Sequence, residues 1–184
     1  MASKIKVDQL ETADGSGTIA LQNQLSGMTT ASLPALGSAQ MPTGSVLQVK
    51  HYQSSGAVTF PQNTGVTTSM YSGTITPSAT SSKIYIIYYS DFGLNGGNYP
   101  AIQQRLTRGS TELDNQGLIG YMDNNNFDRR FQITRTYLDS PSSTSELTYT
   151  VYGGNGTGSG FSGTYNGAGN KTRPGTITLM EIAG

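Results

Sequence analysis

Hydrophobic and polar residues alternate from residue 45 to the C-terminus, and clusters of Gly, Asn, Ser and Pro interrupt the alternation. A period of two places successive side chains on opposite faces of a β-strand, and the interrupting residues are those that favour turns. The alternating runs predict about eight strands, of which the clearest cover residues 46–53, 67–76, 84–89, 101–108, 127–138, 147–151 and 177–182. This spacing is typical of a β-sandwich or jelly roll, so the predicted fold class is all-β.

One of these runs has no polar side. Isoleucine and tyrosine fill every position of the segment Ile84, Tyr85, Ile86, Ile87, Tyr88 and Tyr89. A strand that is apolar on both faces is suited to burial on both sides, so this segment is predicted to lie at the centre of the fold. Two interpretations remain open: the tyrosines line the core of a single chain, or they are shared between copies of the chain.

The first 44 residues lack this alternation, because their apolar residues are sparse and irregular. So little apolar surface does not offset the entropy of ordering the chain. The sequence therefore predicts an N-terminal arm, residues 1–44, and a C-terminal domain, residues 45–184. The arm is expected to dock on another subunit or a larger assembly, by adding a strand to the edge of another protein's sheet. Its candidate docking residues are Ile5, Val7, Leu10, Ile19 and Leu21.

The amino-acid composition limits the kinds of molecule that the protein is expected to bind. Basic and acidic residues number 11 each, and only 12% of residues are charged. This balance excludes a protein that binds nucleic acid or anionic membranes through its charge. No segment approaches the roughly 18 apolar residues of a membrane span, so we expect no membrane insertion and a protein made in a cytoplasm. Few Leu, Ile, Val and Phe side chains are available for a core, which favours oligomerisation.

The chain offers little catalytic chemistry. His51 is the single histidine, no Gly-x-Ser-x-Gly sequence surrounds a serine, and there is no cysteine. Residues 158–163 match the Gly-x-Gly-x-x-Gly spelling, but the glycine-rich residues that follow cannot open a phosphate-binding helix. Residues 123–128 loosely resemble the start of a calcium loop, yet Asp128 stands where that loop needs glycine, which favours a plain turn. Acidic residues leave a glycoside-hydrolase pair open without identifying one. We therefore expect no enzyme, no bound metal and no cofactor.

Three glycine-rich and asparagine-rich loops combine amides with aromatic residues. Such a combination can bind sugars, with a ring stacked on an aromatic face and amides at the hydroxyls. For any single loop, ordinary turn chemistry is the favoured interpretation, because Asn and Gly supply the backbone angles of tight turns. As a set, the loops give the candidate contacts to a host glycan: Asn95, Asn98, Tyr99, Tyr121, Asn124, Asn125, Asn126, Asn155, Phe161 and Tyr165.

Several stretches, taken in order, resemble a known group of proteins. They cover residues 4–8 and 17–21 of the arm, the junction 41–49, and then 75–84, 106–110, 137–141, 147–149 and 177–182. In these stretches the chain resembles short tail-fibre and related virion proteins of tailed phages, particularly those of cyanobacteria and other marine bacteria. The resemblance implies a C-terminal jelly roll similar to the trimeric domains of tumour necrosis factor and complement proteins, with an attachment segment before it.

The resemblance implies a structural role without chemistry. The expected protein is a homotrimer in the virion that attaches by its arm to another virion protein of the tail, baseplate or capsid. In that role it presents its trimeric head to the host surface, as a short tail fibre does. Two alternatives remain: a capsid decoration, cement or head-fibre protein that braces the shell, and a depolymerase that cuts host polysaccharide.

Overall fold

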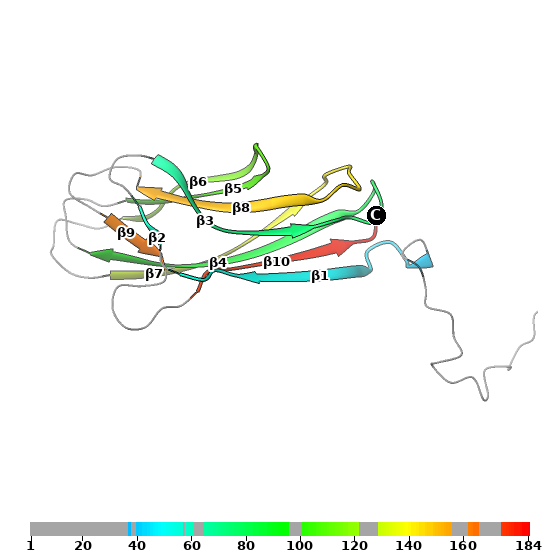
Figure 1. Cartoon of the computed structure of the whole chain (residues 1–184), viewed down its shortest axis with the longest axis horizontal. Helices are drawn as coiled ribbons and strands as arrows, with labels where there is room; N and C mark the ends of the chain where they lie inside the picture. Colours follow the sequence, from blue (N-terminus) through cyan, green and yellow to red (C-terminus); the bar gives the residue numbers. More distant parts are fainter. Residues whose placement is uncertain are drawn as a thin grey trace, which may run out of the picture. The chain divides into compact units, whose positions relative to one another are not determined.

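The alternating segments form ten antiparallel strands in the computed structural model, which describes residues 37, 40–56, 58–60, 65–95, 101–121, 129–155, 162–165 and 174–184. These residues belong to one unit, Gly37–Gly184. The strands make two sheets that stack face to face (Figure 1). The predicted all-β class is therefore confirmed. The arm's five candidate docking residues lie outside the described residues, and the predicted domain boundary stays a prediction.

The first sheet is built around β4 (Lys83–Asn95). Along one edge, β4 pairs with β7 (Arg129–Asp139) over almost its whole length. Along the other edge it pairs first with β10 (Thr176–Ile182) and then with the short β9 (Ser162–Tyr165). Outside these lie β1 (Val46–Gln53), on β10, and β2 (Val58–Thr59), on β9. The sheet is thus four strands wide, with β4 in its interior.

The second sheet has four strands in the order β3 (Gly65–Ile75), β8 (Leu147–Asn155), β5 (Ala101–Arg108) and β6 (Thr111–Tyr121). Counted along the chain, the eight long strands follow the order 1-8-3-6 in the first sheet and 2-7-4-5 in the second. This is the strand order of a jelly roll. The jelly roll expected from the sequence is therefore the observed fold.

The core lies between the two sheets and is formed by every second residue of their strands. Apolar side chains with less than a few per cent exposure fill it, among them Phe60, Ile84, Ile86, Tyr88, Phe92, Leu106, Tyr149, Val151, Ile177 and Leu179. Gly73 of β3 is needed for close approach, because a side chain there would collide with the ring of Tyr52 on β1. The Tyr52 hydroxyl instead donates to the carbonyl oxygen of Thr74 at 2.7 Å and fastens the two sheets at this edge.

A cluster of buried polar side chains links the two sheets across the core. The Tyr71 hydroxyl of β3 donates to the carbonyl oxygen of Tyr89 at 2.8 Å and lies 2.6 Å from Oγ of Ser90. From β5, Nε2 of Gln104 donates to the same Ser90 oxygen at 2.6 Å. These hydrogen bonds link the two sheets inside the core, although Oε1 of Gln104 is buried without a hydrogen-bond partner among the described residues.

The strand predictions hold for most of the chain. The predicted strands 46–53 and 101–108 coincide with β1 and β5, and a turn after Arg108 joins β5 to β6. The sequence analysis missed β6 and the short β2 and β9. Within a single chain, only one face of the all-apolar strand is fully buried, and the interpretation that its tyrosines are shared between copies stays a prediction. Ile84, Ile86 and Tyr88 face the core, whereas Tyr85, Ile87 and Tyr89 on the outer face are partly exposed.

Candidate functional site

The two ends of the sandwich carry different parts of the chain. At one end, which we call the turn end, the start of β1 and the C-terminus meet. The Gly44 N–H donates to the carbonyl oxygen of Ala183, and the Ala183 N–H donates to that of Ser45, both at 2.8 Å. The β5–β6 turn and the connections β3–β4 and β7–β8 lie at this end as well (Figure 1). The described domain therefore begins and ends at the same place.

A fully buried glutamate organises one half of the turn end. Oε1 of Glu181 accepts hydrogen bonds from the N–H and the hydroxyl of Ser78 and from the hydroxyl of Ser82, each at 2.7 Å. Its Oε2 accepts from Nε2 of Gln48 at 2.6 Å. Burial alone would raise the pKa of Glu181, but the hydrogen bonds from Gln48, Ser82 and Ser78 outweigh it and hold the pKa below its ordinary value. The carboxylate thereby ties β10 to β1 and to the β3–β4 turn.

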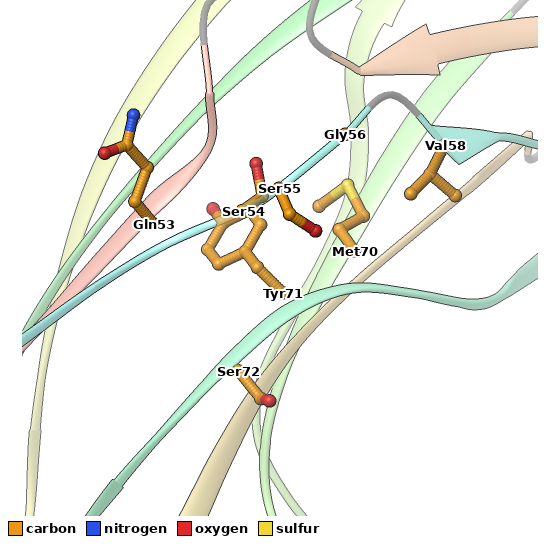
Figure 2. A pocket seen from close by; sticks show the side chains of 8 residues that line it. All are labelled: Gln53, Ser54, Ser55, Gly56, Val58, Met70, Tyr71 and Ser72. Atoms are coloured by element: carbon orange, nitrogen blue, oxygen red, sulfur yellow. The ribbon is translucent and has the colours of Figure 1, made fainter.

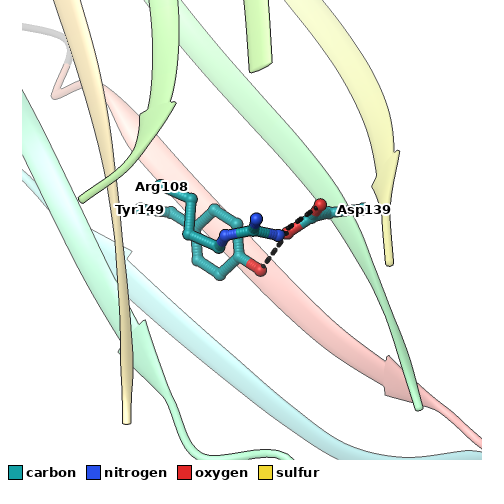
Figure 3. Close-up of polar contacts among 3 residues, drawn as sticks. All are labelled: Arg108, Asp139 and Tyr149. Carbon is teal, nitrogen blue, oxygen red and sulfur yellow. Dashed lines mark hydrogen bonds and ion pairs between the residues drawn. The ribbon is translucent and has the colours of Figure 1, made fainter. Parts of the chain in front are cut away.

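A second buried carboxylate organises the other half (Figure 3). Asp139, at the end of β7, accepts hydrogen bonds at 2.7 Å from Nη1 of Arg108 and from the Tyr149 hydroxyl. Burial alone would lower the pKa of Arg108, but the bond to Asp139 and its charge leave that pKa raised. Burial, and then the bond to Asp139, raise the pKa of Tyr149. This cluster joins β7 of the first sheet to β5 and β8 of the second.

These two clusters bring together the stretches that carried the resemblance. Each stretch from residue 75 onward supplies at least one cluster member: Ser78 and Ser82, Arg108, Asp139, Tyr149 and Glu181. The sequence analysis did not foresee this convergence. The available signal was parity, because Glu181 shares its alternation with Ile177 and Leu179 and so had to face inward. Residues from these stretches therefore lie together at the turn end of the fold.

At the opposite end, which we call the loop end, the strands that carry the candidate glycan contacts finish together. β4 ends at Asn95, β6 at Tyr121 and β8 at Asn155. The backbone register pairs Tyr121 with Ala101 and Asn155 with Ile102, at the start of β5. The side chains of the ten candidate contacts lie outside the described residues. Their role in binding stays a prediction.

A cavity of about 320 Å³ opens between the end of β1 and the middle of β3 (Figure 2). Its lining side chains are uncharged and rich in hydroxyl groups: Gln53, Ser54, Ser55, Val58, Met70, Tyr71 and Ser72, with the backbone of Gly56. The Tyr71 hydroxyl in this lining already donates to the carbonyl oxygen of Tyr89. The lining can form hydrogen bonds with a neutral polar molecule, but it brings no acid and base together.

His51 lies exposed on β1, and its Nδ1 is 2.8 Å from Oγ1 of Thr178 on β10. Within the described ranges, no three histidine, aspartate or glutamate side chains gather in a way that could hold a metal ion. The calcium-like stretch 123–128 and the glycine-rich stretch 158–163 lie outside the described residues. In the part of the chain that the structure describes, no helix is long and apolar enough to cross a membrane.

No family model and no curated protein matches the chain. Among solved structures, it is similar to the infectious bursal disease virus VP2 subviral particle, with 14% identity, a TM-score of 0.39, and coverage of 82% of this chain and 42% of that chain. The T=1 particles derived from infectious bursal virus give 15% identity, a TM-score of 0.39, and coverage of 83% and 41%. The chain thus spans less than half the length of these proteins. At these identities and TM-scores, the likeness is one of fold outline and says nothing of function.

Proposed function

We propose that this chain is a structural protein of a phage virion, in which three jelly rolls associate and residues 1–44 attach to another virion protein. Two observations support the proposal: the jelly-roll strand order, which recurs in viral capsid and lectin domains, and the stretches that resemble phage virion proteins. No enzymatic activity and no cofactor belong to this proposal.

The observation that carries the proposal is the polarity of the sandwich. The arm joins the domain at the turn end, where two buried carboxylates tie five strands and a turn together. The strands with the asparagine-rich loops finish at the opposite end. A domain held at its turn end would direct its loop end away from the attachment point, as a surface protein of a particle requires.

For the place on the virion, we favour a capsid decoration or head-fibre protein over a tail fibre. Jelly rolls are a common fold of viral shells, where many copies cover a large surface. Copy number separates the two places, because a decoration protein is present in hundreds of copies per particle and a tail fibre in tens or fewer. Quantitative mass spectrometry of purified particles, with a known shell protein as standard, measures this number. A chain absent from purified virions would refute the proposed function.

A short tail fibre is the second candidate, and the meeting of the loop strands at one end favours it. In that case three weak sites on one rigid trimer would bind host glycan through multivalency. Binding of the purified protein to host cells, and its loss on removal of surface glycan, tests this role. Release of oligosaccharides from that glycan would instead identify a depolymerase, and we expect none.

The attachment role of the arm has its own test. Deletion of residues 1–40 should leave a soluble trimer that no longer joins particles, because the described β-domain starts after this segment. Incorporation is measured by comparing full-length and truncated protein in particles assembled in vivo. Truncated protein that still enters virions would show that the arm is not the docking segment.

A further inference from the structure

The outer face of the first sheet is ordered into rows that cross four strands, β1, β10, β4 and β7. Pairing places side chains of the same row on the same face. The first row consists of Val49, Met180, Tyr85 and Leu138. The second consists of His51, Thr178, Ile87 and Thr136, and the third of Gln53, Thr176, Tyr89 and Thr134.

The first row is apolar from one edge of the sheet to the other, although water reaches it. Val49 is 53% exposed and Leu138 is 52% exposed, at the two edge strands. Val46, which is 51% exposed, pairs with Ile182 at the border of the same face. These three are the exposed large apolar side chains among the described residues, and all three gather on this face. Exposed apolar groups gathered on one face mark a contact surface.

The three rows contain no lysine, arginine, aspartate or glutamate. Lys83 borders the face at the start of β4, and Asp91, beyond the third row, is fully buried. The outer face of the second sheet differs, because Arg105 lies there 3.5 Å from Glu112 and stacks 4.9 Å above the ring of Tyr152. The lack of charge is therefore a property of one face and not of both.

Every polar group of the three rows can act as hydrogen-bond donor and as acceptor. Threonine and tyrosine hydroxyls do both, as do the glutamine amide and the neutral imidazole of His51. Such a surface is complementary to its own copy, since no like charges meet and each hydroxyl can find a partner in another hydroxyl. A partner recognised through charge would gain nothing from this face. Tyrosine and methionine, present in the apolar row, are also enriched where proteins meet.

We propose that this outer face, centred on Val49, Met180, Tyr85 and Leu138, is the surface through which copies of this chain associate. The number of copies, three, rests on the proposed function; the assignment of the face does not. This contact explains why residues 84–89 of β4 lack a polar face. Its inner residues fill the core of one chain, and Tyr85, Ile87 and Tyr89 are covered by the next copy.

The test places like charges in the contact. In the full-length double variant Val49→Lys, Leu138→Lys, every copy brings the same two charges to the face. Like charges that meet across an interface cost several kcal/mol, so the dissociation constant for self-association should rise at least about a hundredfold. Analytical ultracentrifugation over a concentration series up to about 100 μM measures it. The matched control is Ser72→Lys, Thr148→Lys, with two exposed positions on the outer face of the second sheet, which should associate as the wild type does.

A milder variant guards against a failure to fold. Val49→Thr, Leu138→Thr keeps residues suited to strands and adds no charge, and it should weaken association about tenfold. A double lysine variant that is folded by circular dichroism and assembles like the wild type would overturn the assignment of the face. A wild-type chain that stays monomeric throughout the series would overturn it too. Neither result bears on whether the chain is present in virions, which the copy-number measurement decides separately.

Discussion

The outer faces of the two sheets of this jelly roll differ in charge, although both sheets contribute charged side chains to the interior, among them Arg108 of the second sheet and Asp139 of the first. In the first sheet, Asp139 and Glu181 face inward and are fully buried or nearly so, while the three outer rows carry no charge. In the second sheet, the pair of Arg105 and Glu112 stands on the outer face, in contact with water. An inward carboxylate costs free energy unless donors surround it, and both inward carboxylates have such donors.

Charged side chains therefore have two different roles in this fold. Two buried carboxylates of the first sheet, Asp139 and Glu181, hold strands and turns together at one end of the fold. Asp91 of the same sheet is also buried, but its carboxylate oxygens have no hydrogen-bond partner among the described residues. The outer face of the first sheet avoids charge, as expected for a surface that another copy covers. The outer face of the second sheet follows the ordinary rule for a surface that stays in water, where charged side chains remain hydrated.

The largest effect should follow the loss of the carboxylate that joins the sheets. Asp139→Ala leaves the Arg108 guanidinium and the Tyr149 hydroxyl without their acceptor, so we expect the free energy of unfolding to fall by about 3 kcal/mol. Urea unfolding followed by circular dichroism measures it. The matched control is Glu112→Ala on the exposed pair, where a loss below about 0.5 kcal/mol is expected. Equal losses in the two variants would remove the distinction between buried and exposed charge.

Glu181→Ala should be the next most damaging change. It removes the acceptor for the Ser78 N–H and for three side-chain donors, and we expect a loss of about 2 kcal/mol in the free energy of unfolding. Glu181→Gln keeps one carbonyl oxygen for the Ser78 N–H, and the amide of Gln48 can turn to accept from it. We therefore expect about half the loss in this variant. A glutamine variant less stable than the alanine variant would contradict this account of the cluster.

The same carboxylate predicts how stability depends on pH. Because its folded-state pKa is lowered, the stabilisation it gives is complete above the pKa of an unfolded glutamate, about 4.3, and is lost as the pH falls through the folded-state pKa. The free energy of unfolding should therefore drop on acidification from about pH 5. Glu181→Gln should flatten this drop, whereas Glu112→Gln should leave it unchanged. Unfolding curves at a series of pH values give the comparison.

The smallest effect on the fold should come from the outer face of the first sheet. Leu138→Thr removes a half-exposed side chain and should change the free energy of unfolding of the isolated chain by less than about 0.5 kcal/mol. Thermal unfolding at concentrations too low for association measures it. A large loss of unfolding free energy in this variant would show that Leu138 stabilises its own chain. That result would contradict the assignment of this face as a contact surface.

Much of this fold could be read from the sequence because the physical signal is local. Alternation gave most of the long strands, and the lack of a polar side in Ile84–Tyr89 placed β4 inside its sheet. β6 was missed because its charged and polar residues break the alternation: Glu112 and Asn115 are exposed to water, and Asp114 accepts a hydrogen bond from the Tyr88 hydroxyl. The two carboxylate clusters were missed because their members come from stretches up to 133 residues apart, and only the topology brings them together.

Native mass spectrometry of the full-length chain tests the central claim most directly. We expect an assembly of three copies of the 19.4 kDa chain, which separates into single chains when lysines replace Val49 and Leu138. A single folded chain at every concentration, or an assembly that both lysines leave intact, would contradict the claim that the uncharged face of the first sheet joins the copies.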